Sequence, residues 1–70
     1  MIVIKLKETM KMKGFTISTL AEKTGLHRNG ISKIINGRNN GIEFDTLQKL
    51  CEALDCNVQD IIFYSKNESK

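Results

Sequence analysis

The residues of this chain best suited to recognising another molecule lie between positions 28 and 36. Arg28, Asn29, Lys33 and Asn36 carry hydrogen-bond donors, and helical spacing would place them on an outward side. Arginine and lysine can donate to O6 and N7 of guanine, and asparagine can form two hydrogen bonds with adenine. These residues alone would equally suit a surface helix whose polar side faces water. The elements around them decide between the two interpretations.

The same segment also has an aliphatic side. Three isoleucines follow an i, i+3, i+4 spacing and form one inward stripe: Ile31, Ile34 and Ile35. His27 occupies the N-cap position, and Gly37 ends the helix. Gly30 weakens a helix by roughly 1 kcal/mol relative to alanine, but it would let the backbone approach a groove closely. The pattern predicts an amphipathic helix from about 28 to 36.

A second short helix is predicted just before this one. Thr16 is a good N-cap residue, and the helix 17–24 would bury Leu20. Gly25 follows, where the chain needs a left-handed backbone conformation that glycine adopts without steric cost. Leu26 then enters the core and fixes the turn. Such a pair of helices can hold its second member away from the protein body.

Charge is distributed unevenly along the 70 residues. Residues 1–40 hold eight basic and two acidic side chains, a net charge of +6, whereas residues 41–70 hold three lysines and six acids, a net charge of −3. Positive charge around the predicted helix pair would attract a phosphate backbone and release its counterions. Because the basic part coincides with the helix pair, nucleic acid is favoured over ordinary surface charge.

Composition excludes several classes of protein. The chain is long enough for one domain that buries roughly 60% of its unfolded surface. No apolar run approaches the roughly 20 residues of a membrane span, and the apolar start 1–4 is too short for a signal peptide. We therefore expect a cytoplasmic protein with no membrane contact.

Two cysteines and one histidine offer little chemistry. Cys51 and Cys56 fit no zinc-binding spacing, and His27 lies far from both in sequence. We expect both cysteines to be reduced core residues, with no metal and no cofactor. The chain shows no paired carboxylates, no nucleophile–base pair and no glycine-rich phosphate loop, so an enzyme is disfavoured. A domain this small has little room for a deep pocket, and no small-molecule ligand is expected.

Three further helices complete the prediction. The first spans about 5–13. Asp45, with Gln48 three residues on, matches a capping box and predicts the start of another. Asn57 would cap a last short helix. The apolar residues expected to point inward from these segments are Leu6, Met10, Phe15, Ile42, Phe44, Leu47, Leu50, Leu54, Val58, Ile61 and Ile62.

The two ends contain more β-prone residues than a helical core needs. Ile2, Val3 and Ile4 stand at one end, and Phe63 and Tyr64 at the other. The N-terminal segment is expected either to be extended and to pair with the segment after the last helix or with a second chain, or to cap the bottom of the core.

The motifs together resemble the phage-repressor and Cro-type helix-turn-helix family, also called the xenobiotic-response-element type. The matching stretches are FTISTLAEKTGL, HRNGISKIINGR, IEFDTLQKLCEALDC and VQDII. The resemblance covers roughly residues 6–62. It implies an all-α, five-helix, lambda-repressor-like DNA-binding domain over residues 1–64, followed by a disordered tail, 65–70. The closest likeness is to compact single-domain members from bacteria and phages.

The resemblance also implies roles for individual residues. In that family the second helix of the pair is the recognition helix. The residues that would face base edges are Arg28, Asn29, Ser32 and Lys33, and those that would touch phosphates are Thr16, His27, Asn36, Arg38 and Asn39. The chain departs from the family at Ile17, where glutamine is common, and at His27, where serine or threonine is common.

We therefore expect a sequence-specific regulator of transcription that binds double-stranded DNA. The family favours a repressor that binds a palindromic operator as a homodimer through the helix 28–36. The alternative is a protein-interaction module on the same fold, such as an antitoxin-like or anti-repressor partner. Its sequence support is Ile17 and the weak cap at His27.

Overall fold

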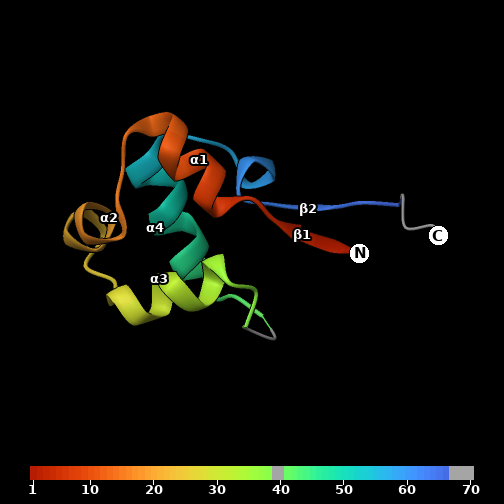
Figure 1. Ribbon diagram of the computed structural model, residues 1–70, viewed down its shortest axis with the longest axis horizontal. Helices are drawn as coiled ribbons and strands as arrows, with labels where there is room; N and C mark the ends of the chain where they lie inside the picture. Colours follow the sequence, from red (N-terminus) through yellow and green to blue (C-terminus); the bar gives the residue numbers. More distant parts are fainter. Residues whose placement is uncertain (39–40, 67–70) are drawn as a thin grey trace.

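The computed structural model describes residues 1–38 and 41–66. Helices gather around one core, and a narrow two-stranded sheet projects from it, which gives extents of 39 × 22 × 18 Å (Figure 1). The elements in chain order are β1 (Ile2–Ile4), α1 (Leu6–Lys13), α2 (Ile17–Thr24), α3 (Arg28–Ile35), α4 (Phe44–Leu54), the 3₁₀ helix η1 (Val58–Asp60) and β2 (Ile62–Tyr64).

The core is aliphatic, because each helix turns one apolar stripe inward. Its buried members are Leu6, Met10, Leu20, Ile31, Ile34, Leu50, Ala53, Leu54 and Ile61. The two free cysteines are half-buried against this cluster. Burial, together with the neighbouring Cys51 thiol, raises the pKa of the Cys56 thiol. Cys56 is therefore protonated at neutral pH and behaves as a small apolar residue.

The expectation of an all-α, five-helix domain was wrong in two respects. The described chain has four α-helices, and the predicted fifth is the three-residue 3₁₀ helix η1. The Asp60 backbone N–H donates to the Asn57 carbonyl at 3.0 Å, and the Ile61 N–H donates to the Val58 carbonyl at 2.9 Å. These i→i+3 bonds tighten the turn before an α-helix can form. Val58, expected to point inward, is exposed.

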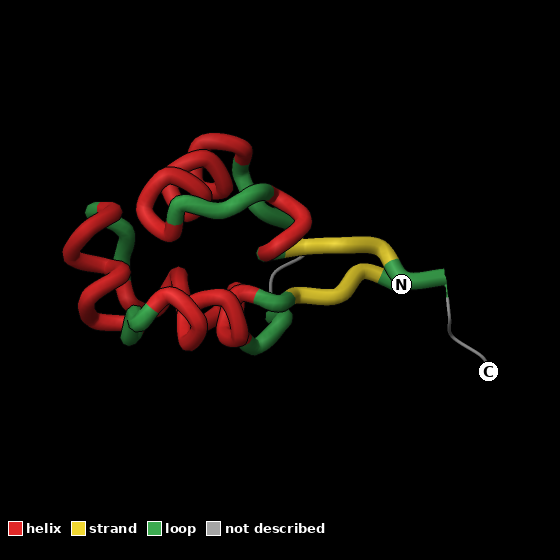
Figure 2. Tube along the Cα trace, turned by 90° about the horizontal axis from the view of Figure 1, so that it is seen from above, coloured by secondary structure: helices red, strands yellow, loops and turns green. Residues whose placement is uncertain are grey.

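The second difference is the sheet. β1 and β2 pair antiparallel in the register Ile2↔Tyr64, Val3↔Phe63 and Ile4↔Ile62. This confirms pairing within the chain, one of the alternatives left open by the sequence. The Met1 amine donates to the Ser65 carbonyl at 2.6 Å, and Ser65 N–H donates to the Met1 carbonyl at 2.8 Å, which extends the ladder. Figure 2 shows the two strands running side by side away from the helices.

The start of α4 also differs from the prediction. Glu43, not Asp45, is the N-cap residue, and it makes no side-chain capping bond. Asp45 lies within the first turn, where its carboxylate pairs with the Lys49 amine at 3.3 Å. Phe44, expected in the core, has an exposed fraction of 89%. The predicted capping box fails because both of its members bond forward along the helix, Gln48 to Glu52 at 3.2 Å.

The predicted tail falls partly outside the described residues. Ser65 and Lys66 are described, and positions 67–70 are not. Within residues 1–38 and 41–66, no helix combines the length and the apolar character that crossing a membrane requires.

Candidate nucleic-acid interface

The helix pair α2–α3 has the architecture that its local signals predict. Thr16 adopts an extended conformation at the N-cap of α2, and its hydroxyl accepts a hydrogen bond from the Thr19 backbone N–H at 3.1 Å. The Thr19 hydroxyl accepts from the Thr16 backbone N–H at 2.9 Å, which completes a reciprocal box. Gly25 ends α2 at φ +79°, in the left-handed region. The start and end of α2 are therefore set by residues next to it in sequence.

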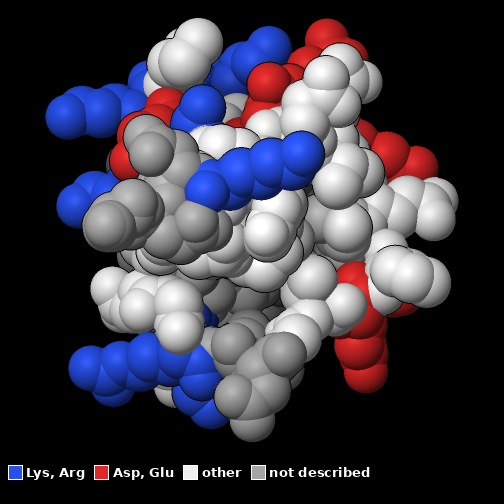
Figure 3. Space-filling model, turned by 90° about the vertical axis from the view of Figure 1, so that its right-hand side faces the viewer, with Lys and Arg blue, Asp and Glu red and all other residues white. Residues whose placement is uncertain are grey.

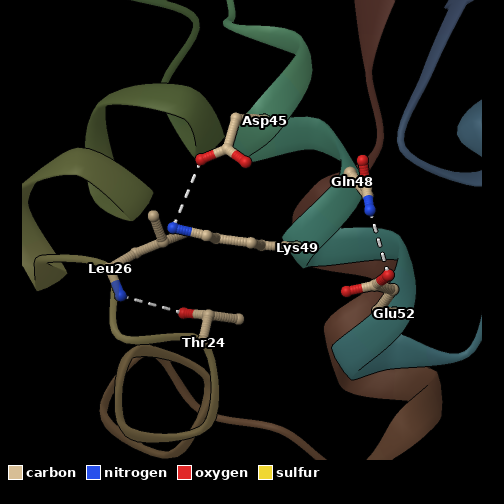
Figure 4. A network of polar contacts seen from close by, with 6 residues as sticks. All are labelled: Thr24, Leu26, Asp45, Gln48, Lys49 and Glu52. Atoms are coloured by element: carbon tan, nitrogen blue, oxygen red, sulfur yellow. Dashed lines mark hydrogen bonds and ion pairs between the residues drawn. The ribbon is translucent and has the colours of Figure 1, made fainter.

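Thr24 fixes the turn between the two helices. Its hydroxyl donates to the Leu20 carbonyl at 2.7 Å. It also accepts from the Leu26 backbone N–H at 3.2 Å, the bond drawn in Figure 4. Leu26 packs against the core from the turn. One side chain therefore holds both the last turn of α2 and the start of the connection to α3.

Helix α3 has one buried apolar side and one exposed polar side. Ile31 and Ile34 are buried, at exposed fractions of 0% and 5%. Arg28, Asn29 and Lys33 are exposed on the other side. The helix lies along the lower edge of the molecule in Figure 1, with no other element below it. A surface of donors therefore stands at the edge of the domain, where a groove can reach it.

Arg28 is held in place by a residue that sequence reasoning missed. The Arg28 guanidinium Nη1 donates to the Ser18 hydroxyl at 3.3 Å, so the first residue of α3 is tied to the first turn of α2. Both side chains are exposed. The only sequence signal was the placement of a small hydroxyl residue in that turn, which falls opposite Arg28 once the two helices are packed. The bond restricts the guanidinium without covering it.

Ser32 and Asn36 form a second small network on the same helix. The Asn36 amide donates to the Ser32 hydroxyl at 3.3 Å. Both residues line a hollow of about 420 Å³ between α1 and α3, whose rim on the α1 side is formed by Lys7 and Lys11. The two lysines stand one helical turn apart. The hollow therefore combines hydrogen-bonding groups of α3 with positive charge from α1.

Other predicted contact residues differ in how much they are already engaged. Within the described part of the chain, the side chains of Asn29 and Lys33 form no hydrogen bond or ion pair. His27 is the exposed N-cap of α3 and makes no side-chain capping bond. Arg38 is exposed just after the helix. Asn39, also predicted to touch phosphate, lies outside the described residues.

The two departures from the family pattern have different structural outcomes. Ile17 is half-buried and packs against the core, so it contributes to packing where a glutamine would offer hydrogen bonds. His27 leaves the first N–H groups of α3 without a side-chain acceptor. A helix N-terminus with free N–H groups favours a negative group nearby.

Comparison with known proteins agrees with this architecture. The sequence model of the Cro/C1-type helix-turn-helix DNA-binding domain matches residues 5–67. A Bacillus subtilis (strain 168) protein named as the HTH-type transcriptional regulator YozG is 28% identical over 67 residues. That match covers 96% of this chain and 80% of the relative. The matched region takes in all four α-helices, η1 and β2, and begins just after β1.

Proposed function

The chain belongs to the Cro/C1-type helix-turn-helix DNA-binding family, and we propose that it is a repressor that binds a palindromic operator as a homodimer. Membership of this family makes it a DNA-binding regulator of transcription and not an enzyme. To this family assignment we add three proposals: that the protein represses transcription, that its operator is a palindrome, and that it binds as a homodimer. The observation that carries the proposal is the free polar side of α3 above a buried aliphatic stripe.

Reading of bases would come from the first two turns of α3. Arg28 and Lys33 would donate to O6 and N7 of guanine, and Asn29 would pair with adenine. Ser32, half-buried beside Asn36, would add a short-range hydroxyl contact. The Ser18 bond supports this role for Arg28, because a guanidinium that is already oriented loses less side-chain freedom on binding.

Phosphate contacts would flank the recognition helix on both sides. Thr16 and His27 stand at the N-termini of α2 and α3, where helix dipoles and free N–H groups favour anions. Asn36 and Arg38 stand at the other end of α3. With Asn39 they would position the helix in the groove without selecting a base sequence.

A single recognition helix reads only a few base pairs, which gives too little specificity for a regulator. Two copies related by a two-fold axis would read two half-sites one helical turn apart, roughly 34 Å. The operator would then be a palindrome, since its symmetry mirrors that of the protein. Bound at a promoter, such a small dimer would act by occupying the DNA.

Selection of bound duplexes from a random pool tests the proposal directly. We expect an enriched palindrome, with two protomers bound per duplex and affinity that falls steeply as salt rises. A random duplex of equal length is the matched control. Equal affinity for the selected and the random duplex at physiological salt would refute sequence-specific regulation.

The alternative of a protein-interaction module loses part of its support. Ile17, which suggested a surface without DNA contacts, packs against the core and leaves the outward side of α3 unchanged. A stable complex with another protein, together with no measurable affinity for any duplex, would restore this alternative.

A further inference from the structure

Both faces of the two-stranded sheet carry apolar side chains, but only one of them lines a hollow. Residues paired across antiparallel strands share a face, so the register places Ile2, Ile4, Ile62 and Tyr64 on one side, which we call the inner face. Val3 and Phe63 lie on the opposite side, where the Lys5 amine stands 5.2 Å from the centre of the Phe63 ring. Ile2 and Tyr64, at the outer end of the inner face, have exposed fractions of 61% and 62%.

A hollow lies between the inner face and the end of α3. It encloses about 380 Å³, and its lining is apolar apart from backbone atoms: Ile2, Ile4, Ile34, Gly37, Gly41, Ile42 and Ile62. The projecting strands and the hollow at their base form one continuous surface, which we call the ribbon surface. A two-stranded sheet is marginally stable in water unless something packs on it. Ile4 and Ile62 pack against the core, whereas the outer pair, Ile2 and Tyr64, is exposed and would be stabilised by a partner.

The shape of the ribbon surface suits a copy of itself. An isologous dimer needs a patch that is complementary to itself. Here a projecting apolar end, Ile2 and Tyr64, adjoins an apolar hollow on the same molecule. Two copies related by a two-fold axis can each place these side chains against the hollow of the other.

Charge on this end of the molecule favours the same arrangement. Figure 3 looks onto the ribbon end. Most of its Lys and Arg lie at the left, lower left and top, with some Asp or Glu among them, and one basic side chain crosses the uncharged middle, whereas the charged atoms at the right margin are all Asp and Glu. A two-fold axis parallel to the vertical of this view brings the basic left side of one copy opposite the acidic right side of the other. The same axis is vertical in Figure 1, so both copies keep α3 on the lower edge.

We propose that the ribbon surface is the contact through which two copies of this chain pair, each covering the inner face and hollow of the other. The inference rests on the proposed homodimeric function and names the surface that makes it. Because the hollow is lined by Ile34 in the last turn of α3 and by Gly37 just after it, the contact would fix the distance between the two recognition helices.

Single lysine substitutions on exposed positions test this surface. Tyr64→Lys and Ile2→Lys each place a charge in the contact, and Met12→Lys is the matched control, since Met12 is 83% exposed on α1. Sedimentation velocity of the full chain should show a species of twice 7.9 kDa for the unmodified protein and Met12→Lys. We expect Tyr64→Lys to raise the dimer dissociation constant about 30-fold or more, the effect of losing an aromatic anchor. Far-UV circular dichroism checks that each variant is folded.

Binding to DNA separates this inference from the proposed function. On a selected duplex cut to one half-site, all four proteins should bind with equal affinity, whereas on the full palindrome the two ribbon variants should lose cooperative binding. A monomer both free and on DNA, or a dimer that resists both ribbon substitutions, overturns the inference. So does a monomer whose native mass includes an apolar ligand or another protein. A ribbon-dependent dimer with no affinity for DNA would leave the inference intact and refute the proposed function.

Discussion

Helices α3 and α4 are both amphipathic, yet their outward sides are in different states. On α4, Asp45 pairs with Lys49 at 3.3 Å and Gln48 donates to Glu52 at 3.2 Å, so the polar groups satisfy one another along the helix (Figure 4). On α3, Asn29 and Lys33 have no such partner among the described residues. The outer side of α3 therefore keeps donors that are free to bind another molecule, whereas the pairs described on α4 satisfy each other.

The difference follows from the sequence of each helix. α4 carries opposite or complementary groups four positions apart, the spacing at which helix side chains meet. α3 has basic and amide groups and no acid in the sequence RNGISKII, so no ion pair can form along it. Nucleic acid can supply the acceptors that this helix lacks.

The largest effect is expected from the inward side of α4. Leu50 is fully buried in the core, and Leu50→Ala should lower the free energy of unfolding by about 2–5 kcal/mol, because it removes packed methyl groups and leaves a cavity. Urea denaturation measures the change. A loss below about 1 kcal/mol would show that α4 is not the core element described here.

A smaller effect on α3 should appear in binding alone. Lys33→Ala is expected to cost about 1–3 kcal/mol of affinity for the selected operator and to relax preference at one base pair, because a base contact is lost. Lys49→Ala on α4 is the matched control and should change neither, since its partner is Asp45. Titration of operator and random duplexes measures both. Equal losses for the two variants would erase the contrast between the helices.

Arg38→Ala sharpens the comparison by affecting all sequences alike. Loss of a phosphate contact should weaken binding to operator and random duplex by similar factors, and should reduce the slope of log affinity against log salt by about one per protomer. Salt titrations of both duplexes measure this. A loss confined to the operator would instead assign Arg38 to base reading.

The smallest effect is expected at the paired surface of α4. Asp45→Asn removes an exposed i, i+4 ion pair and should lower stability by only about 0.3–0.5 kcal/mol, with less effect at high salt. Thermal unfolding at two salt concentrations measures it. A loss above about 1 kcal/mol would mean that Asp45 supports the start of α4 in a further way.

The sequence predicted the helix pair well because its boundaries depend on neighbouring residues. The helix 17–24 was predicted with the bounds that the structure shows, since Thr16 and Gly25 act on the backbone beside them. The roles of individual contact residues remain predictions. Ser18 was missed because its partner, Arg28, is ten positions away and meets it only after packing.

Prediction failed where tertiary structure decides. Phe44 is apolar and was placed in the core, but α4 begins beyond the edge of the core, so its first residue is exposed. Val58, Ile61 and Ile62 were too few to distinguish an α-helix from a 3₁₀ turn followed by a strand. The partner of β1 lies nearly sixty positions away in sequence, and no local pattern could select it over the alternatives.

The pairing of β1 with β2 has a consequence for how the protein is made. Met1 and Ser65 are hydrogen-bonded although they are 64 positions apart, so β1 is synthesised well before its partner strand exists. At about 5–20 residues per second, the wait is roughly 3–13 s. During that interval β1 has no strand to pair with, and the helix pair is synthesised. Closure of the ribbon therefore comes at the end of translation of this domain.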